Sequence, residues 1–133
     1  MIQAQKTAIV LFAHGARDAR WARPLEHLKR ELQRRQPQLR VDVAFLELQT
    51  PDLAEAMTRI ASDGFAQIHV APVFWSMGGH VAKDLPALIE AFRLLHPSVR
   101  IDVLPVLAEL PGMNDFLAGS VLAQLGIDTP EPP

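Results

Sequence analysis

Two histidines stand beside glycines, each after a run of apolar residues. His14 directly follows the apolar run 8–13, and His80 closes the Ser-Met-Gly-Gly-His sequence of residues 76–80. Neutral imidazole binds first-row divalent metals and titrates near neutral pH, so both residues suit metal or proton chemistry. The adjacent glycines would let a bulky flat ligand approach the backbone. A single loop histidine is more often structural, but two at equivalent positions favour a functional site.

Charged side chains accompany the two histidines. Glu47, at the end of another apolar run, would add a carboxylate ligand without demanding a soft ion. Arg17 and Lys83 lie close in sequence to the histidines and could bind substrate carboxylates. Each has a structural alternative, because Glu47 can complement the dipole of the following helix and the basic residues can be solvated loop charges. For Glu109 the structural interpretation is favoured.

Four β-then-α units are predicted along the chain. Apolar runs predict strands at 7–13, 41–48, 67–74 and 100–107. Helical spacing predicts helices at 20–36, between Pro51 and Gly64, at 85–95 and at 113–125. Trp21 falls on the apolar stripe of the first helix, and Thr50 is the expected N-cap of the second. His69, inside the third strand, is expected to be a satisfied core or interface histidine.

This alternation determines the expected fold. Strands that alternate with helices indicate parallel βαβ units with right-handed crossovers, so we expect a compact α/β sandwich around a four-stranded parallel sheet. The carboxyl ends of such strands meet in one crevice, so His14, Glu47 and His80 should face a common ligand. A sheet this small has edges that invite a partner.

Length and composition limit the function classes. The 133 residues predict one domain, at 1–128, followed by a disordered Pro-rich tail at 129–133. A net charge of -2 gives no reason to expect nucleic acid or an anionic membrane as a partner. The absence of cysteine excludes disulfides and thiolate catalysis, and no apolar stretch is long enough to span a bilayer. The N-terminus lacks the pattern of a signal peptide, so we expect a cytoplasmic protein.

Several familiar catalytic motifs are missing from the sequence. No G-x-G-x-x-G follows the first strand and no Walker A loop is present, so nucleotide binding lacks its usual support. No serine occupies a G-x-S-x-G elbow. A response regulator would have acids where His14 stands, and a phosphohistidine phosphatase would have arginine in place of Ala13.

Three segments resemble the small, single-domain form of the class II sirohydrochlorin chelatases. They are Leu-Phe-Ala-His-Gly-Ala-Arg-Asp at 11–18, Ala-Phe-Leu-Glu at 44–47 and Pro-Val-Phe-Trp-Ser-Met-Gly-Gly-His-Val-Ala-Lys-Asp-Leu-Pro at 72–86. Their order and spacing agree with the family from about residue 7 to 117. The His-Gly motif alone is weak, but its combination with the third segment is fairly specific.

The resemblance implies a lyase that inserts a divalent metal into sirohydrochlorin without ATP, for siroheme or cobalamin synthesis. It implies a chelatase-like (flavodoxin-like) three-layer sandwich that is half of a two-lobed chelatase and pairs as a homodimer. The metal, cobalt, iron or nickel, would be a substrate, and no organic cofactor is expected. By this resemblance His14 and His80 are catalytic and metal-binding, with Glu47 as a further ligand. Arg17, Gly79 and Lys83 would bind the carboxylate-rich tetrapyrrole.

One departure keeps other hypotheses open. The family usually has serine in its His-Gly-Ser-Arg motif, where this chain has Ala16. The change removes a hydroxyl close to the predicted site. A metal or tetrapyrrole carrier without turnover is therefore an alternative. A generic flavodoxin-like binding module with structural histidines is another.

Overall fold

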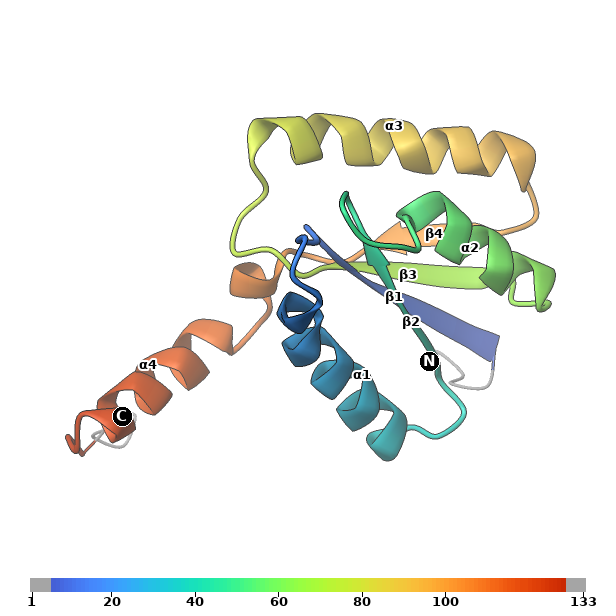
Figure 1. Ribbon diagram of the computed structural model, residues 1–133. Coiled ribbons are helices and arrows are strands. Elements are labelled where there is room, and N and C mark those ends of the chain that lie inside the picture. Colours follow the sequence, from blue (N-terminus) through green and yellow to red (C-terminus); the bar gives the residue numbers. More distant parts are fainter. Residues whose placement is uncertain (1–5, 129–133) are drawn as a thin grey trace.

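A four-stranded parallel sheet forms the centre of the protein (Figure 1). The computed structural model describes residues 6–128, so the predicted tail at 129–133 lies outside the described residues. The strands are β1 (Thr7–Ala13), β2 (Arg40–Phe45), β3 (Gln67–Pro72) and β4 (Arg100–Val103), in the order β2-β1-β3-β4. Every pairing is parallel, which confirms the predicted sheet.

The central strand β1 explains why its sequence is apolar without alternation. Val10 and Phe12 point into the larger of two core clusters, whereas Leu11 points into the smaller cluster on the opposite face. All three side chains are at most 2% exposed. A strand covered on both faces needs apolar residues at every position.

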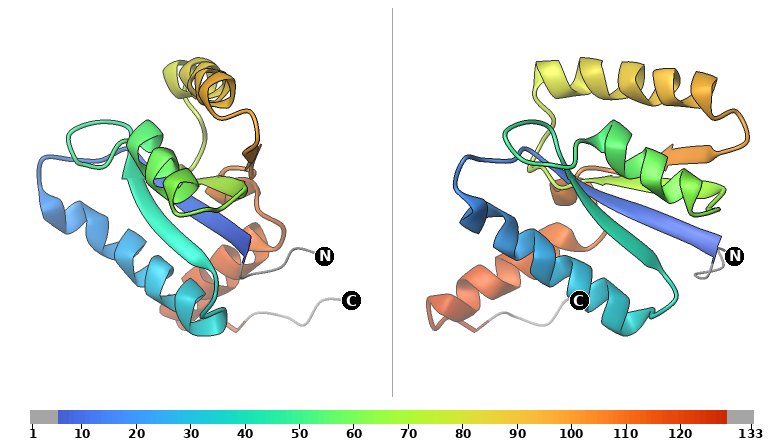
Figure 2. Two further views of the ribbon diagram at one scale, coloured as in Figure 1. Left: turned by 90° about the vertical axis from the view of Figure 1, so that its right-hand side faces the viewer. Right: turned by 45° about the vertical axis from the view of Figure 1, so that its right-hand side comes forward.

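Helices cover the two faces of the sheet and complete three layers (Figure 2). On one face, α1 (Arg23–Arg35) follows the short helix η2 (Ala19–Ala22) and buries Leu25 against β1 and β2. On the other face, α2 (Leu53–Ser62) and α3 (Gly79–Leu95) contribute Met57, Ile60, Leu85 and Ile89 to the larger cluster. The predicted three-layer α/β sandwich is therefore confirmed.

The last helix does not join these layers. α4 (Met113–Gln124) follows the short helix η3 (Leu107–Glu109) and has no buried residue. It projects away from the sheet in Figure 1. No helix within residues 6–128 combines the length and apolarity needed to cross a bilayer.

The strands end earlier than their sequences predict. β2 stops at Phe45 rather than near residue 48, because the chain then turns and the Phe45 N–H donates to the Pro51 carbonyl. β3 stops at Pro72 and β4 stops two residues before Pro105. Pro72 has no N–H to donate to the next bond of the ladder with β4, which accounts for the end of the β3–β4 pairing.

Three predicted helix starts were wrong in detail. α3 begins at Gly79, ahead of the predicted range 85–95. The N-cap of α2 is Asp52, whose carboxylate accepts from the Glu55 N–H at 2.8 Å, so Thr50 lies outside the helix. Trp21 belongs to η2 rather than to the regular helix, and its side chain is 75% exposed. The predicted helix end at Gly64 is confirmed, with φ of 92° immediately after the C-cap.

Candidate functional site

The strand order places a ligand crevice at the ends of β1 and β3. The chain leaves neighbouring strands β1 and β3 toward helices on opposite faces of the sheet, which separates the two following loops. Such a topological switch point is where open α/β sheets bind ligands. His14 is the first residue after β1, and the segment from Val73 to His80 follows β3. His14 therefore lies in one of the two loops that border this point, and His80 lies at the start of the helix that follows the other loop.

Backbone hydrogen bonds join the loops after β1 and β2. The Leu46 N–H donates to the Ala13 carbonyl at 2.8 Å, and the Glu47 N–H donates to the His14 carbonyl at 3.1 Å. The Ala16 N–H donates to Gln49 Oε1 at 3.0 Å. These bonds hold Glu47 beside His14, with both residues exposed.

Gly15 makes the contact between these loops possible. Its φ of 85° lies in the left-handed region, and a Cβ built on it would lie 2.0 Å from the Glu47 carbonyl oxygen. The sequence suggested that this glycine admits a ligand to the backbone. The structure gives it a different role, because the space beside Gly15 is filled by the Glu47 backbone.

The Phe74 ring packs against the His14 ring. The two rings meet edge to face, with centroids 4.8 Å apart and planes at 84°. Phe74 in turn meets Phe12 edge to face at 5.6 Å and is only 6% exposed. A buried aromatic stack therefore orients an exposed imidazole.

The remaining predicted site residues lie on the surrounding loops and helix. Gly79 and His80 begin α3 after the N-cap Gly78, and Lys83 lies one turn later. All three are exposed, as is Arg17 in the loop after β1. Within residues 6–128 no three His, Cys, Asp or Glu side chains lie close enough to hold a metal ion. The ligand roles of His14, His80 and Glu47 therefore stay predictions, as do the binding roles of Arg17, Gly79 and Lys83.

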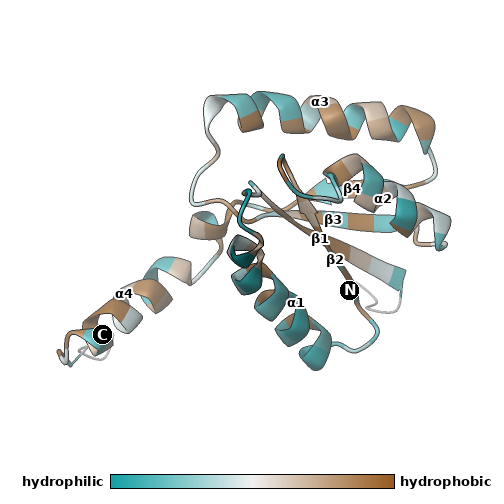
Figure 3. Cartoon of the chain, viewed as in Figure 1, coloured by the Kyte–Doolittle hydropathy of each residue, from teal (hydrophilic) through white to brown (hydrophobic). Residues whose placement is uncertain are grey.

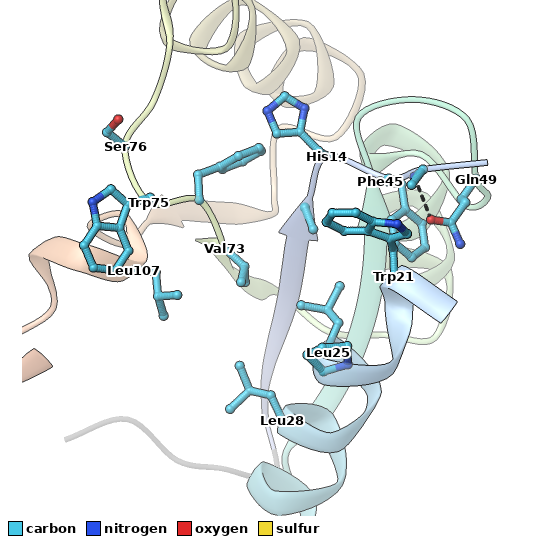
Figure 4. A pocket seen from close by; sticks show the side chains of 15 residues that line it. His14, Trp21, Leu25, Leu28, Phe45, Gln49, Val73, Trp75, Ser76 and Leu107 are labelled. Atoms are coloured by element: carbon cyan, nitrogen blue, oxygen red, sulfur yellow. Dashed lines mark hydrogen bonds between the residues drawn. The ribbon is translucent and has the colours of Figure 1, made fainter. Parts of the chain in front are cut away.

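An apolar cavity of about 780 Å³ opens beside His14. Trp21 and Trp75 lie on opposite sides of it, and His14 lies between them at one end (Figure 4). Both indoles are largely exposed, at 75% and 65%. The sequence pattern does not indicate this pair, since helical spacing places Trp21 on a buried stripe and Trp75 stands only within a family-like segment.

His69 differs from its prediction. It lies in β3 opposite Ile9 of β1 and Asp102 of β4. Its Nε2 is shielded from solvent and has no hydrogen-bond partner within the described residues. The expectation of a satisfied core histidine was therefore wrong, and the expectation of an interface histidine stays a prediction.

These features define a doubly wound α/β protein with an aromatic-lined cavity and an exposed histidine at its topological switch point. The model of one protein family, CbiX, matches residues 8–123. That match covers most of the sequence, and the chain belongs to the CbiX family.

Known proteins agree with this assignment. The chain is 32% identical over 82 residues to the sirohydrochlorin cobaltochelatase of Methanopyrus kandleri, which covers 62% of this chain and 57% of that relative. A crystal structure described as a cobalamin-biosynthesis CbiX protein from Marinobacter aquaeolei VT8 matches with a TM-score of 0.78 and 30% identity, over 90% of this chain and 98% of that one.

A second solved structure relates this chain to part of a longer protein. The sirohydrochlorin chelatase SirB from Bacillus subtilis subspecies spizizenii, in complex with cobalt, matches with a TM-score of 0.66 and 25% identity. The match covers 75% of this chain and 43% of the SirB chain. This chain thus spans little more than half of its Methanopyrus relative and less than half of SirB.

Proposed function

We propose that this protein inserts a divalent metal, cobalt or iron, into sirohydrochlorin without ATP, as a lyase of cobalamin or siroheme synthesis. The observation that carries the proposal is the exposed His14 ring at the rim of the aromatic-flanked cavity. The Methanopyrus relative is named for this reaction, and SirB is a sirohydrochlorin chelatase solved with cobalt. Membership of the CbiX family supports the same reaction class.

The chemistry requires a metal donor and a proton acceptor at one place. A divalent metal replaces two pyrrole N–H protons, so two protons must leave the macrocycle. Imidazole can release a loosely held metal and accept a proton, which suits His14 and His80. A metal that is held by few protein ligands keeps open coordination positions for exchange. Such a site favours transfer of the metal over its storage.

Aromatic and charged residues would hold the macrocycle. Trp21 and Trp75 offer flat apolar surfaces on opposite sides of the cavity. Arg17 and Lys83 would bind the carboxylates at the rim of the tetrapyrrole, and Gly79 leaves space at the start of α3. Glu47, held beside His14 by its backbone, would add a ligand to the incoming metal.

We further propose that residues 1–128 form one chelatase domain that acts as a cytoplasmic homodimer. The chain corresponds to 43% of the SirB chain, which supports the idea that two copies supply the two lobes of a chelatase. The described residues of one chain contain no cluster of three metal ligands, which also favours a site completed by a second copy.

Metallation of sirohydrochlorin tests the proposed reaction. Purified protein with cobalt(II) or iron(II) should accelerate the absorbance change over the metal-only control, with multiple turnovers. His14→Ala and His80→Ala should each lower the rate, whereas His27→Ala, an exposed histidine on α1, should leave it unchanged. A rate equal to the metal-only control across metals and pH would refute catalysis. Stoichiometric binding without turnover would instead favour a carrier.

A further inference from the structure

The chain between β1 and η2 has little packing to hold it in place. Residues 14–18, His-Gly-Ala-Arg-Asp, are mostly hydrophilic, as the part of the chain that leaves β1 shows in Figure 3. None of these five residues is buried, and His14 and Arg17 are exposed. Burial of apolar surface, which fixes the core segments, therefore contributes little here. Polar contacts must determine where this segment lies.

Gly15 is the point about which this segment could turn. Its φ of 85° belongs to the left-handed region, which glycine enters at no steric cost. Before the glycine, the His14 carbonyl accepts the Glu47 N–H. After the glycine, the Ala16 N–H donates to Gln49 Oε1 at 3.0 Å, drawn as a dashed line in Figure 4. Among the described residues, this is the only hydrogen bond by which the segment after the glycine reaches another loop.

The loop that carries Gln49 has a strained backbone. The Gln49 N–H donates to the Glu47 carbonyl at 2.8 Å, and Leu48 between them has φ of 66°. A hydrogen bond from residue i+2 to residue i around a positive φ is the pattern of a γ-turn that is rare and strained. Leu48 is 58% exposed, so burial of its side chain does not offset this strain. Strain that the surrounding structure maintains is typical of functional sites.

The rest of the loop holds Gln49 in this place. Backbone hydrogen bonds fix both of its ends, from Leu46 to Ala13 and from Phe45 to Pro51. Gln49 is half-buried and lines the cavity. Its Nε2 has no hydrogen-bond partner within residues 6–128, so the acceptor oxygen is the atom that the fold engages.

We infer that Gln49 is a positioning residue for His14. Its side-chain oxygen holds the Ala16 amide, and this bond keeps the chain from turning about Gly15, so that the exposed imidazole stays against Phe74. A displacement of about 1 Å at a reacting group can lower a rate on the order of 100-fold. The consequence for metal insertion rests on the proposed function, whereas the positioning itself does not.

Three variants separate the acceptor of Gln49 from its other properties. Q49L removes the acceptor at similar size, and Q49E keeps an acceptor oxygen but has no N–H to donate. The matched control is Q67L, because Gln67 is also half-buried and donates to Asp102 at 2.9 Å, at the opposite end of the sheet. Each leucine variant loses one hydrogen bond, so each should lower Tm by no more than roughly 5 °C.

Proton NMR measures the position of His14 without any ligand. In wild-type protein the ring current of Phe74 should separate the ring-proton shifts of His14 from those of the exposed His27 at the same pH. Q49L should reduce this separation and lower the exchange protection of the Ala16 amide roughly 10-fold or more. Q49E should restore both properties, and Q67L should leave both unchanged. Unaltered His14 shifts in Q49L would overturn the inference. Q49E that behaves like Q49L would also overturn it, because the effect would then belong to Nε2.

Metallation kinetics connects this position to the reaction. With sirohydrochlorin and cobalt(II), Q49L should lower kcat about 10- to 100-fold while KM for sirohydrochlorin changes little. Q49E should recover most of kcat, and Q67L should match the wild-type protein. An unchanged kcat in Q49L, with or without a raised KM, would overturn the inference. Wild-type protein without metallation activity would refute the proposed function instead, and the NMR comparison alone would then decide whether Gln49 positions His14.

Discussion

Substitution of Gly15 by alanine should destabilise the protein and disturb the predicted site. The φ of 85° costs a residue with Cβ about 1–2 kcal/mol. The added methyl would also lie 2.0 Å from the Glu47 carbonyl oxygen and 3.2 Å from Phe45 Cβ. Since both neighbours are held by the β2 loop, relief of that overlap should cost a further ~1–3 kcal/mol. We expect a total loss of about 2–5 kcal/mol.

Substitution of a second glycine, Gly64, separates the cost of backbone strain from the cost of steric overlap. Gly64 has φ of 92° but no atom within 4 Å of the place that a Cβ would take, so Gly64→Ala experiences only the backbone strain. Thermal unfolding of both variants measures the difference. In a chain of this size, each kcal/mol corresponds to roughly 3–5 °C in Tm, so Gly15→Ala should unfold at least several degrees below Gly64→Ala.

The same comparison can contradict the prediction of steric overlap at Gly15. Equal Tm values for Gly15→Ala and Gly64→Ala would mean that the Glu47 backbone does not press against Gly15. At a temperature where all variants are folded, Gly15→Ala should also lower the metallation rate, because His14 and Glu47 move apart. Gly64→Ala, distant from these loops in sequence, should leave that rate unchanged.

Substitutions at three further positions have defined outcomes. Asp52→Ala should lower unfolding stability by about 1 kcal/mol through loss of the α2 N-cap, and Asp52→Asn should restore it, as judged by urea denaturation. Phe74→Leu should reduce stability by only about 1.5 kcal/mol or less but lower the metallation rate, because the imidazole loses its support. Hydrogen bonds from Arg34, the larger contribution, and from Arg35 lower the pKa of Glu31 to about 2. The stability that this carboxylate contributes is therefore present above its ordinary pKa of 4.5 and lost as pH falls toward 2, so the small Tm difference from Glu31→Gln should vanish over that interval.

Periodicity predicted the strands and helices well because burial determines them. β1 matches its predicted range at 7–13, since residues 8–13 are apolar at every position. The ends of the elements depend on individual hydrogen bonds that a pattern does not specify. The return of the chain at Pro51, which ends β2 and moves the α2 cap from Thr50 to Asp52, is one such case.

The edge of the sheet that carries His14 was predictable from the sequence, but the contacts of His14 at that edge were not. Parallel topology alone places residues after β1 and β3 at one edge, so His14 and His80 could be located from their strands. The contact of Gly15 with Glu47 and the stack of His14 on Phe74 depend on residues far apart in sequence. The exposure of Trp21 could not be predicted because helical spacing extends back through η2. The backbone of η2 is a 3-10 helix and not an α-helix.

Phe74 contacts both the candidate site and the segment that leads into α4. Its ring supports His14, and its carbonyl accepts the Leu107 N–H at 3.1 Å. Leu107 begins η3, lines the cavity and leads directly into α4. The residue at the switch point thus joins the candidate metal-binding histidine to the segment from which the last helix departs. Because the Phe74 ring packs against His14 while its backbone carbonyl holds Leu107, the orientation of His14 and the position of η3 depend on the same residue.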